Sequence, residues 1–353
     1  MRDCLEDLLQ DADVRHYTTP IAMDDLDDVR AALGYDQINL WGGSYGSRAA
    51  LVYLRRHPEH VRAVIVDGLA PAALQLPRYI GEDAARALEL MLADCEQDPD
   101  CSGAFPQLRD KWVQLLARLE AEPDQVRLAH PRTGEIDEFT ITRSGVVLLV
   151  RATLYVAEAS TLLPLIIERA QERDYAPLLA LADPWVGVAE SMSIGMLFSV
   201  LCSEDISRIS DEERQGLAHE PLLGSCIVDQ WGLVCDFWPL AELPPGYHEP
   251  VISDKPTLVL SGELDPVRPP RWGELTAQHL SNSKHVVVPG VAHGTSGTGC
   301  IPRMMAQFID SASLDGLDTQ CVEELSRPMF FHSFAGPRVG TIETTETAEA
   351  TEQ

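Results

Sequence analysis

The sequence holds 353 residues, of which 45% are hydrophobic and 23% charged, as in ordinary globular proteins with a large core. Its formal net charge of −28 argues against nucleic acids and anionic membranes as partners, because binding to phosphate needs clustered lysine and arginine. No apolar run is long enough for a membrane helix, so we expect no membrane insertion.

The first 71 residues predict the beginning of a parallel α/β core. A helix starts at Pro20, since proline is favoured in the first turn of a helix. The stripe that we expect this helix to bury consists of Ala22, Leu26, Val29 and Leu33. Apolar strands at 37–41 and 61–66 flank a helix at 48–57. This alternation of helices and strands is typical of a parallel sheet with right-handed crossovers.

The pattern becomes mostly helical between residues 72 and 250. We expect helices at 84–93, 108–119, 144–159, 162–171 and 189–200. A hairpin interrupts them, with strands at 125–130 and 136–142 joined by a turn that contains Gly134. These features predict a large helical cap, 72–250, inserted into the α/β core.

The strand and helix pattern then returns. Strands at 257–260 and 285–288 are followed by helices at 272–280 and 301–309. The predicted domains are therefore the first part of the core, 1–71, the cap, 72–250, the second part of the core, 251–330, and an acidic disordered tail, 331–353.

The segment around Ser44 carries the clearest chemical signal. Gly42, Ser44 and Gly46 form a G-x-S-x-G motif between a predicted strand and a predicted helix, which is the context of a nucleophile elbow. In that turn the serine hydroxyl stands at the carboxyl edge of the sheet, above a helix N-terminus that favours negative charge. The alternative is an ordinary turn in which serine caps the helix.

Two further residues follow strand ends. With Ser44 they give the chain order Ser, Asp, His, which a catalytic triad on a parallel α/β sheet can have. Asp265 comes after the strand at 257–260, and His293 comes after the strand at 285–288. An imidazole can take the proton of the serine hydroxyl, and a carboxylate holds that imidazole in the correct tautomer. Taken singly, Asp265 could be a turn residue before Pro266, and His293 a surface histidine. Jointly with Ser44 they predict a triad.

Three segments, 42–47, 262–270 and 290–294, resemble the prolyl aminopeptidase and tripeptidyl aminopeptidase family of α/β-hydrolases. The resemblance implies a hydrolase core with a helical cap that removes short N-terminal pieces from peptides, without a metal or other cofactor. The substrates implied are peptides, with small esters as the alternative.

The front of the chain departs from that family. Its members carry earlier strands and a His-Gly-Gly type of loop that supplies one oxyanion donor, and nothing before Ser44 resembles this loop. The backbone N–H of Tyr45 is the other expected donor. We interpret the chain as lacking the N-terminal part of the core, together with any signal peptide. A signal peptide in the full-length gene would make the protein periplasmic or secreted.

The cap segment that holds Glu204 and Asp205 resembles a place where members of that family carry acids, and the resemblance implies that these two bind the ammonium group of a peptide. A solvated helix end explains them equally well. Three hypotheses therefore stay open: an aminopeptidase that releases proline or short N-terminal pieces, a carboxylesterase with the same triad, and a truncated chain without catalysis.

Eight cysteines are many for a cytosolic enzyme, and their spacing fits no zinc site. Disulfides in an oxidising compartment are the better account. We expect bonds Cys95–Cys101 and Cys300–Cys321 and no partner for Cys4. A further bond is expected within one set of three, in which the sequence does not select the pair: Cys202, Cys226 and Cys235.

Overall fold

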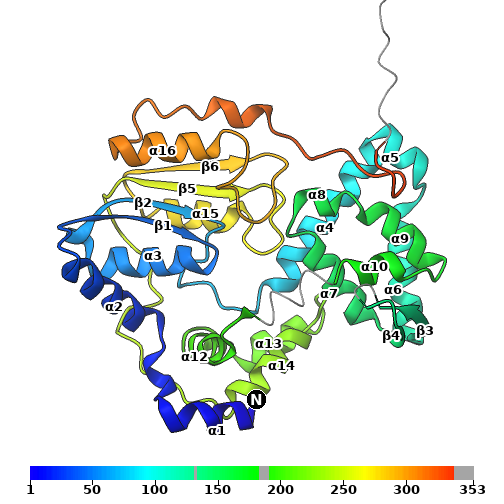
Figure 1. The fold of residues 1–353 in the computed structure, drawn as a ribbon, viewed down its shortest axis with the longest axis horizontal. Helices are drawn as coiled ribbons and strands as arrows, with labels where there is room; N and C mark the ends of the chain where they lie inside the picture. Colours follow the sequence, from blue (N-terminus) through cyan, green and yellow to red (C-terminus); the bar gives the residue numbers. More distant parts are fainter. Residues whose placement is uncertain (131–132, 183–190, 338–353) are drawn as a thin grey trace, which may run out of the picture.

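The computed structural model describes residues 1–130, 133–182 and 191–337 (Figure 1). Its centre is a four-stranded parallel sheet with the strand order β1-β2-β5-β6. The strands are β1 (Ile38–Gly43), β2 (Val61–Asp67), β5 (Thr257–Gly262) and β6 (Ser283–Val288). The expected parallel α/β core is confirmed, and β2 pairs directly with β5 although the whole cap separates them in sequence.

Helices cover both faces of this sheet (Figure 1). Alternate residues of β2 explain the two layers: Val64 and Val66 pack in the cluster that includes α3, whereas Ala63 and Ile65 pack in the cluster that includes α16. The core helices are α2 (Thr19–Ala32), α3 (Tyr45–Arg56), α15 (Pro270–Ala277) and α16 (Ile301–Ser311).

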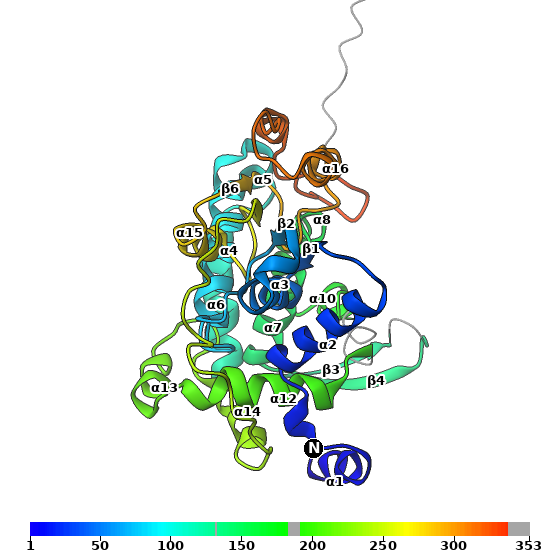
Figure 2. The same cartoon turned by 90° about the vertical axis from the view of Figure 1, so that its left-hand side faces the viewer.

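The residues between β2 and β5 form a mainly helical region beside the sheet (Figures 1 and 2). One group contains α4 (Ile80–Gln97), α5 (Pro99–Ala104), α6 (Leu108–Ala121), α7 (Arg143–Thr153), α8 (Ala157–Ser160), α9 (Leu163–Gln171) and α10 (Ala176–Ala180). It also holds the antiparallel hairpin β3 (Asp124–Ala129) and β4 (Ile136–Ile141), which confirms the predicted hairpin. The second group contains α12 (Ile194–Glu204), α13 (Asp211–Leu217) and α14 (Cys226–Cys235).

Short 3-10 helices cover Val14–His16, Pro58–His60, Ile206–Arg208 and Gln320–Glu324. The first helix, α1 (Arg2–Asp11), packs on the cap and not on the sheet, because Leu5 lies in one cluster with Phe198 and Trp238. We therefore propose that α1 belongs structurally to the cap and that the core begins at α2. The proposed tail falls largely outside the described residues, as does the start of the helix expected at 189–200.

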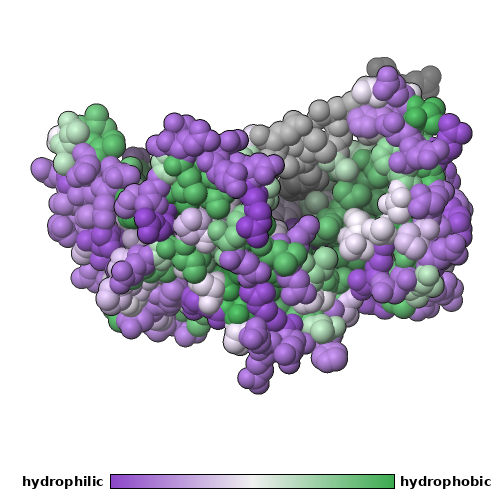
Figure 3. Space-filling view, turned by 90° about the horizontal axis from the view of Figure 1, so that it is seen from below, coloured by the Kyte–Doolittle hydropathy of each residue, from purple (hydrophilic) through white to green (hydrophobic). Residues whose placement is uncertain are grey.

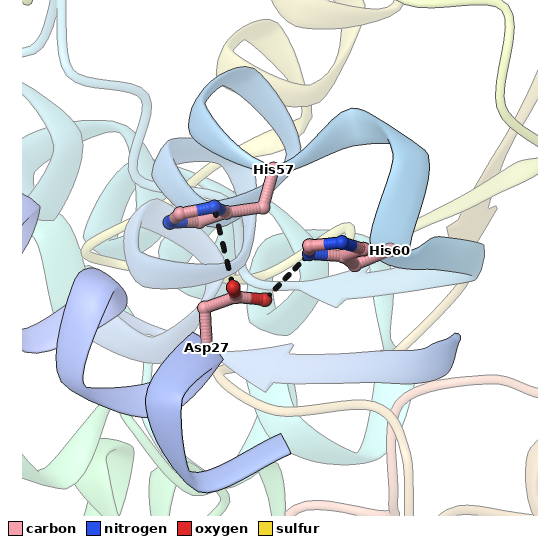
Figure 4. Close-up of side chains that lie close together, drawn as sticks. All are labelled: Asp27, His57 and His60. Carbon is pink, nitrogen blue, oxygen red and sulfur yellow. Dashed lines mark hydrogen bonds and ion pairs between the residues drawn. The ribbon is translucent and has the colours of Figure 1, made fainter. Parts of the chain in front are cut away.

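The prediction of a buried apolar stripe on α2 is wrong. Leu26, Val29 and Leu33 are 37%, 53% and 66% exposed. The helix instead turns its charged side toward α3 and the segment after it. There the Asp27 carboxylate accepts a hydrogen bond from Tyr53 and contacts His57 and His60, as Figure 4 shows for the two histidines. Charge pairing, which apolar periodicity cannot report, decides the orientation of this helix.

Three disulfides join described residues: Cys95–Cys101, Cys202–Cys235 and Cys300–Cys321. Both pairings expected from the sequence are confirmed, and the undecided bond forms between α12 and α14. Cys4 and Cys226 are free and exposed. Hydrophilic residues dominate the face seen in Figure 3, in keeping with the large negative charge. Among the helices of the described residues, none is long and apolar enough to cross a membrane.

Candidate active site

The turn after β1 holds Ser44 in a conformation that few residues other than glycine adopt. Its φ is 54° and its ψ is −120°, and its N–H donates to the carbonyl of Asp67 at 2.8 Å. Glycine is required at position 42, since an added Cβ would lie 2.0 Å from the carbonyl oxygen of Gly46. The serine therefore sits on a tight strand-to-helix turn at the N-terminus of α3, as the motif predicts.

Asp265 and His293 are in direct contact. The Asp265 Oδ2 atom lies 2.7 Å from Nδ1 of His293, and the N–H groups of Val267 and Arg268 each donate to Oδ1 at 2.8 Å. Burial alone would raise the pKa of Asp265, but His293 and these two donors hold it below its ordinary value. An ionised carboxylate can thus orient the imidazole and stabilise its protonated form.

Ser44, Asp265 and His293 come from three strand ends at the same edge of the sheet. In the parallel register, Gly43 of β1 lies beside Asp67 of β2, and β2 lies beside β5. Asp67 links the two sides of the site. Its carbonyl accepts from the Ser44 N–H, and its carboxylate accepts from the loop that follows His293.

That carboxylate is held by four donors. The N–H groups of Thr295 and Ser296 lie 2.7 and 2.8 Å from Oδ2, and both hydroxyls also bind Asp67, at 3.1 and 2.6 Å. Its neighbour Gly68 has a φ of 59°, and a Cβ there would lie 3.0 Å from the His293 ring. Asp67 therefore fixes the position of the histidine loop, a role that the sequence analysis did not identify.

A cavity of about 310 Å³ lies where Tyr45 and Arg48 of the core meet Val200, Leu201 and Asp205 of the cap. Arg48 is 1% exposed and donates to both oxygens of Asp205, at 2.8 and 3.1 Å. Burial opposes the charge of the guanidinium, yet Asp205 raises the pKa of Arg48 above its ordinary value. The helix that follows Ser44 is thereby tied to the cap.

Glu204 is fully buried behind this ion pair. Thr19 donates to it from its N–H at 2.6 Å and from its hydroxyl at 2.9 Å, Tyr247 donates a third hydrogen bond, and Nη1 of Arg48 lies 3.6 Å away. Burial raises the pKa of Glu204 although these neighbours favour its charged form. Of the two candidate acids, Asp205 lines the cavity, and Glu204 lies behind it.

A second cavity, of about 190 Å³, is lined in part by His293. Tyr155 lines it and packs edge-on against the histidine ring, with the ring centroids 5.3 Å apart. The backbone carbonyl of Tyr155 also accepts from the His293 N–H at 3.2 Å. The cap thus contacts the candidate general base directly.

Among the residues that the structure describes, one group lies close enough to hold a metal ion: Asp27, His57 and His60, with ligand atoms within 4.8 Å of one another (Figure 4). Arg30 already donates to both oxygens of Asp27, so that carboxylate is neutralised without a metal. The histidines lie beyond the C-terminal end of α3, whereas Ser44 precedes its start, roughly 18 Å away along the helix. We assign this group a structural role in joining α2 to α3.

Comparison with known proteins agrees with this architecture. Residues 7–127 match the alpha/beta hydrolase fold family, and residues 222–321 match the TAP-like protein family. The chain has the α/β-hydrolase fold. The serine protease Hip1 of Mycobacterium tuberculosis is 26% identical over 328 residues, which cover 87% of this chain and 62% of that protein.

Tripeptidyl aminopeptidase of Streptomyces lividans is 46% identical over 116 residues, 31% of this chain and 22% of that protein. Proline iminopeptidase of Xylella fastidiosa is 27% identical over 129 residues, 36% of each chain. The chain thus spans less than two thirds of the length of these curated relatives, which are named as peptidases.

Proposed function

We propose that this α/β-hydrolase is a serine peptidase that releases proline or short N-terminal pieces from peptides through an acyl-enzyme. The observation that carries the proposal is the buried contact between Asp265 and His293, at the same sheet edge as the strained Ser44 turn. In the proposed reaction His293 removes the proton of the Ser44 hydroxyl, and the oxygen attacks the carbonyl carbon of the substrate.

The tetrahedral intermediate carries a negative charge on oxygen, and the N–H of Tyr45 is its proposed donor. Tyr45 is the first residue of α3, and the first N–H groups of a helix have no acceptor within the helix. His293 then gives its proton to the leaving amine, and a water molecule releases the acyl group by the same steps in reverse order.

Buried charge at the cavity supports a substrate with a free N-terminus. Arg48 carries one positive charge beside two carboxylates, Glu204 and Asp205, so the ionised cluster keeps one net negative charge. A protonated amine in the cavity would balance that charge, and an uncharged ester would not. We propose that these two acids select peptides with a free amino group, with Asp205 nearer to the substrate.

The first experiment concerns Ser44→Ala. The glycines at 42 and 46 set the turn, so we expect an intact fold with hydrolysis lowered at least about a thousandfold. A fluorophosphonate probe should label the wild type at Ser44 and leave the variant unlabelled. Persistent labelling of the alanine variant would place the nucleophile elsewhere.

A carboxylesterase is the second candidate, favoured by the apolar lining that Val200 and Leu201 give the cavity. Prolyl, alanyl and tripeptidyl naphthylamides should be assayed beside nitrophenyl esters. Cleavage of esters alone would favour the esterase, and a folded protein that cleaves neither would favour a non-catalytic role. We also propose an oxidising compartment outside the cytosol, on the strength of the three disulfides.

A further inference from the structure

Two arginines are buried in the described part of the chain, and their surroundings differ. Arg48 is paired with Asp205 and also donates to backbone carbonyls. Arg268 is 5% exposed, yet no carboxylate of the described residues forms an ion pair with it. Its one side-chain hydrogen bond runs from Nη1 to the carbonyl of Val267, at 2.6 Å, and its buried Nε has no partner there.

The position of Arg268 places this unpaired guanidinium beside the candidate triad. Its backbone N–H binds Asp265, so its side chain leaves the turn that holds the acid. Burial lowers its pKa and Arg48 adds to that effect, whereas Tyr155, Asp265 and Asp83 act in the opposite direction. Arg268 thus lies within electrostatic reach of Arg48 at one cavity and of Tyr155 at the other.

The free edge of this guanidinium has the shape of a carboxylate site. Because Nη1 is used by Val267, the edge formed by Nε and Nη2 remains without a partner among the described residues. Two parallel N–H groups on that edge match the two oxygens of a carboxylate. A buried cation without a counter-ion is unfavourable, and a bound anion would remove that cost.

We propose that Arg268 forms a carboxylate-binding subsite beside the candidate triad and selects substrates that carry a carboxylate near the cleaved bond. This proposal rests on the proposed hydrolase function. The carboxylate has two sources in a peptide: the C-terminus of a short leaving group, or an acidic side chain in the residue whose carbonyl is attacked. Both present the same planar anion to the guanidinium.

Matched substrates separate these sources. One pair is a tetrapeptide with a free C-terminus and its C-terminal amide. The other is a naphthylamide with glutamate or glutamine at the cleaved residue. In the wild type, the carboxylate member of at least one pair should have a kcat/KM about tenfold to a hundredfold higher, the range of a charge-assisted hydrogen bond.

The variants are Arg268→Gln, which removes the charge, and Arg268→Lys, which keeps it without the bidentate edge. Arg268→Gln should abolish the preference within the responding pair and leave the neutral substrate within about threefold of wild type. Arg268→Lys should keep part of the preference. No preference in either pair, or equal losses on charged and neutral substrates, would overturn the proposal and leave Arg268 a structural residue.

A binding measurement keeps this test separate from the proposed function. In Ser44→Ala, titration calorimetry compares the tetrapeptide acid with its amide, or the glutamyl with the glutaminyl ligand. We expect tighter binding of the carboxylate ligand, lost when Arg268→Gln is added. That result without turnover by the wild type would support the subsite and contradict the peptidase. Equal binding of acid and neutral ligands would refute the subsite even if the wild type cleaves peptides.

Discussion

The Glu204 carboxylate is fully buried. It belongs to a cluster in which two carboxylates face one guanidinium, that of Arg48. Replacement by glutamine keeps the shape and removes the negative charge beside Arg48 and Asp205. We expect Glu204→Gln to lower kcat/KM about tenfold for substrates with a free amino group, because their ammonium loses its counter-charge. A nitrophenyl ester, which presents no ammonium, should react nearly as before.

The direction of the pH effect follows from the raised pKa of Glu204. As the pH falls, this carboxyl takes up a proton earlier than an ordinary glutamate, and the cluster becomes neutral. KM for the peptide relative to the ester should therefore rise on acidification in the wild type and change less in Glu204→Gln. Equal losses on both substrates would remove Glu204 from substrate binding.

Asp67 offers a second test at this scale, since it positions the loop of His293 without contact to substrate. Asp67→Asn keeps one acceptor oxygen and replaces the other by an NH2 group, so it cannot accept from all four donors. We expect kcat to fall about tenfold to a hundredfold with little change in KM, because the base is misplaced whereas the cavity is intact. Fluorophosphonate labelling of Ser44 should slow in parallel. A change in KM alone would contradict a positioning role.

The candidate site divides into residues that sequence can predict and residues that it cannot. Ser44, Asp265 and His293 follow strands in a fixed order, so local patterns identify them. Arg48 lies in an apolar helix and Arg268 in a turn. The electrostatic role of each depends on buried neighbours that are remote in sequence, so local patterns do not identify them.

Among the elements, the strands were predicted best. Each is a run of apolar, often β-branched residues that ends in a loop, as β2 and β5 illustrate, and all four lie within three residues of their expected bounds. The single helix expected at 144–159 is instead two, α7 and α8, with a turn between them that brings Tyr155 to His293. Apolar periodicity continues through such a turn, so the break leaves no trace in it.

The bond Cys202–Cys235 joins α12 to α14 close to the two candidate substrate acids. It closes a loop of 33 residues, and loss of such a cross-link costs roughly 3–4 kcal/mol by the chain-entropy account. We expect the double variant Cys202→Ala/Cys235→Ala to unfold at lower denaturant and to lose peptide turnover before it loses the core. Replacement of the free, exposed Cys226 is the matched control and should change stability by less than about 0.5 kcal/mol.

For the whole molecule, the free energy of unfolding depends on pH through carboxyls whose pKa values shift in opposite directions. Burial raises the pKa of Asp83 to about 6 although Trp272 and Arg271 favour its charged form. Between pH 4 and 6 the folded state keeps a proton that an unfolded aspartate has lost, so this group lowers stability as the pH rises, by at most about 3 kcal/mol. Asp27 acts in the opposite direction, because its hydrogen bond with Arg30 lowers its pKa. Its stabilising contribution to the folded state is therefore lost as the pH falls.

Asp83→Asn tests this balance by denaturant unfolding at a series of pH values. The free energy of unfolding of the variant should vary less than that of the wild type between pH 4 and 6, and the variant should gain relative to the wild type above pH 6. Parallel curves for the two proteins would show that Asp83 is not the titrating group.

The pairing of β2 with β5 has a consequence in time. About 190 residues separate Asp67, the end of β2, from Thr257, the start of the neighbouring strand β5. At ordinary rates of protein synthesis β2 is therefore made roughly 10–40 seconds before β5. During that interval the edge of β2 that later pairs with β5 has no partner, and Ala63 and Ile65 lack the helix α16 that later packs against them. The turn that holds Ser44 is therefore synthesised well before Asp265 and His293, and the candidate triad stays incomplete until the whole cap has been made.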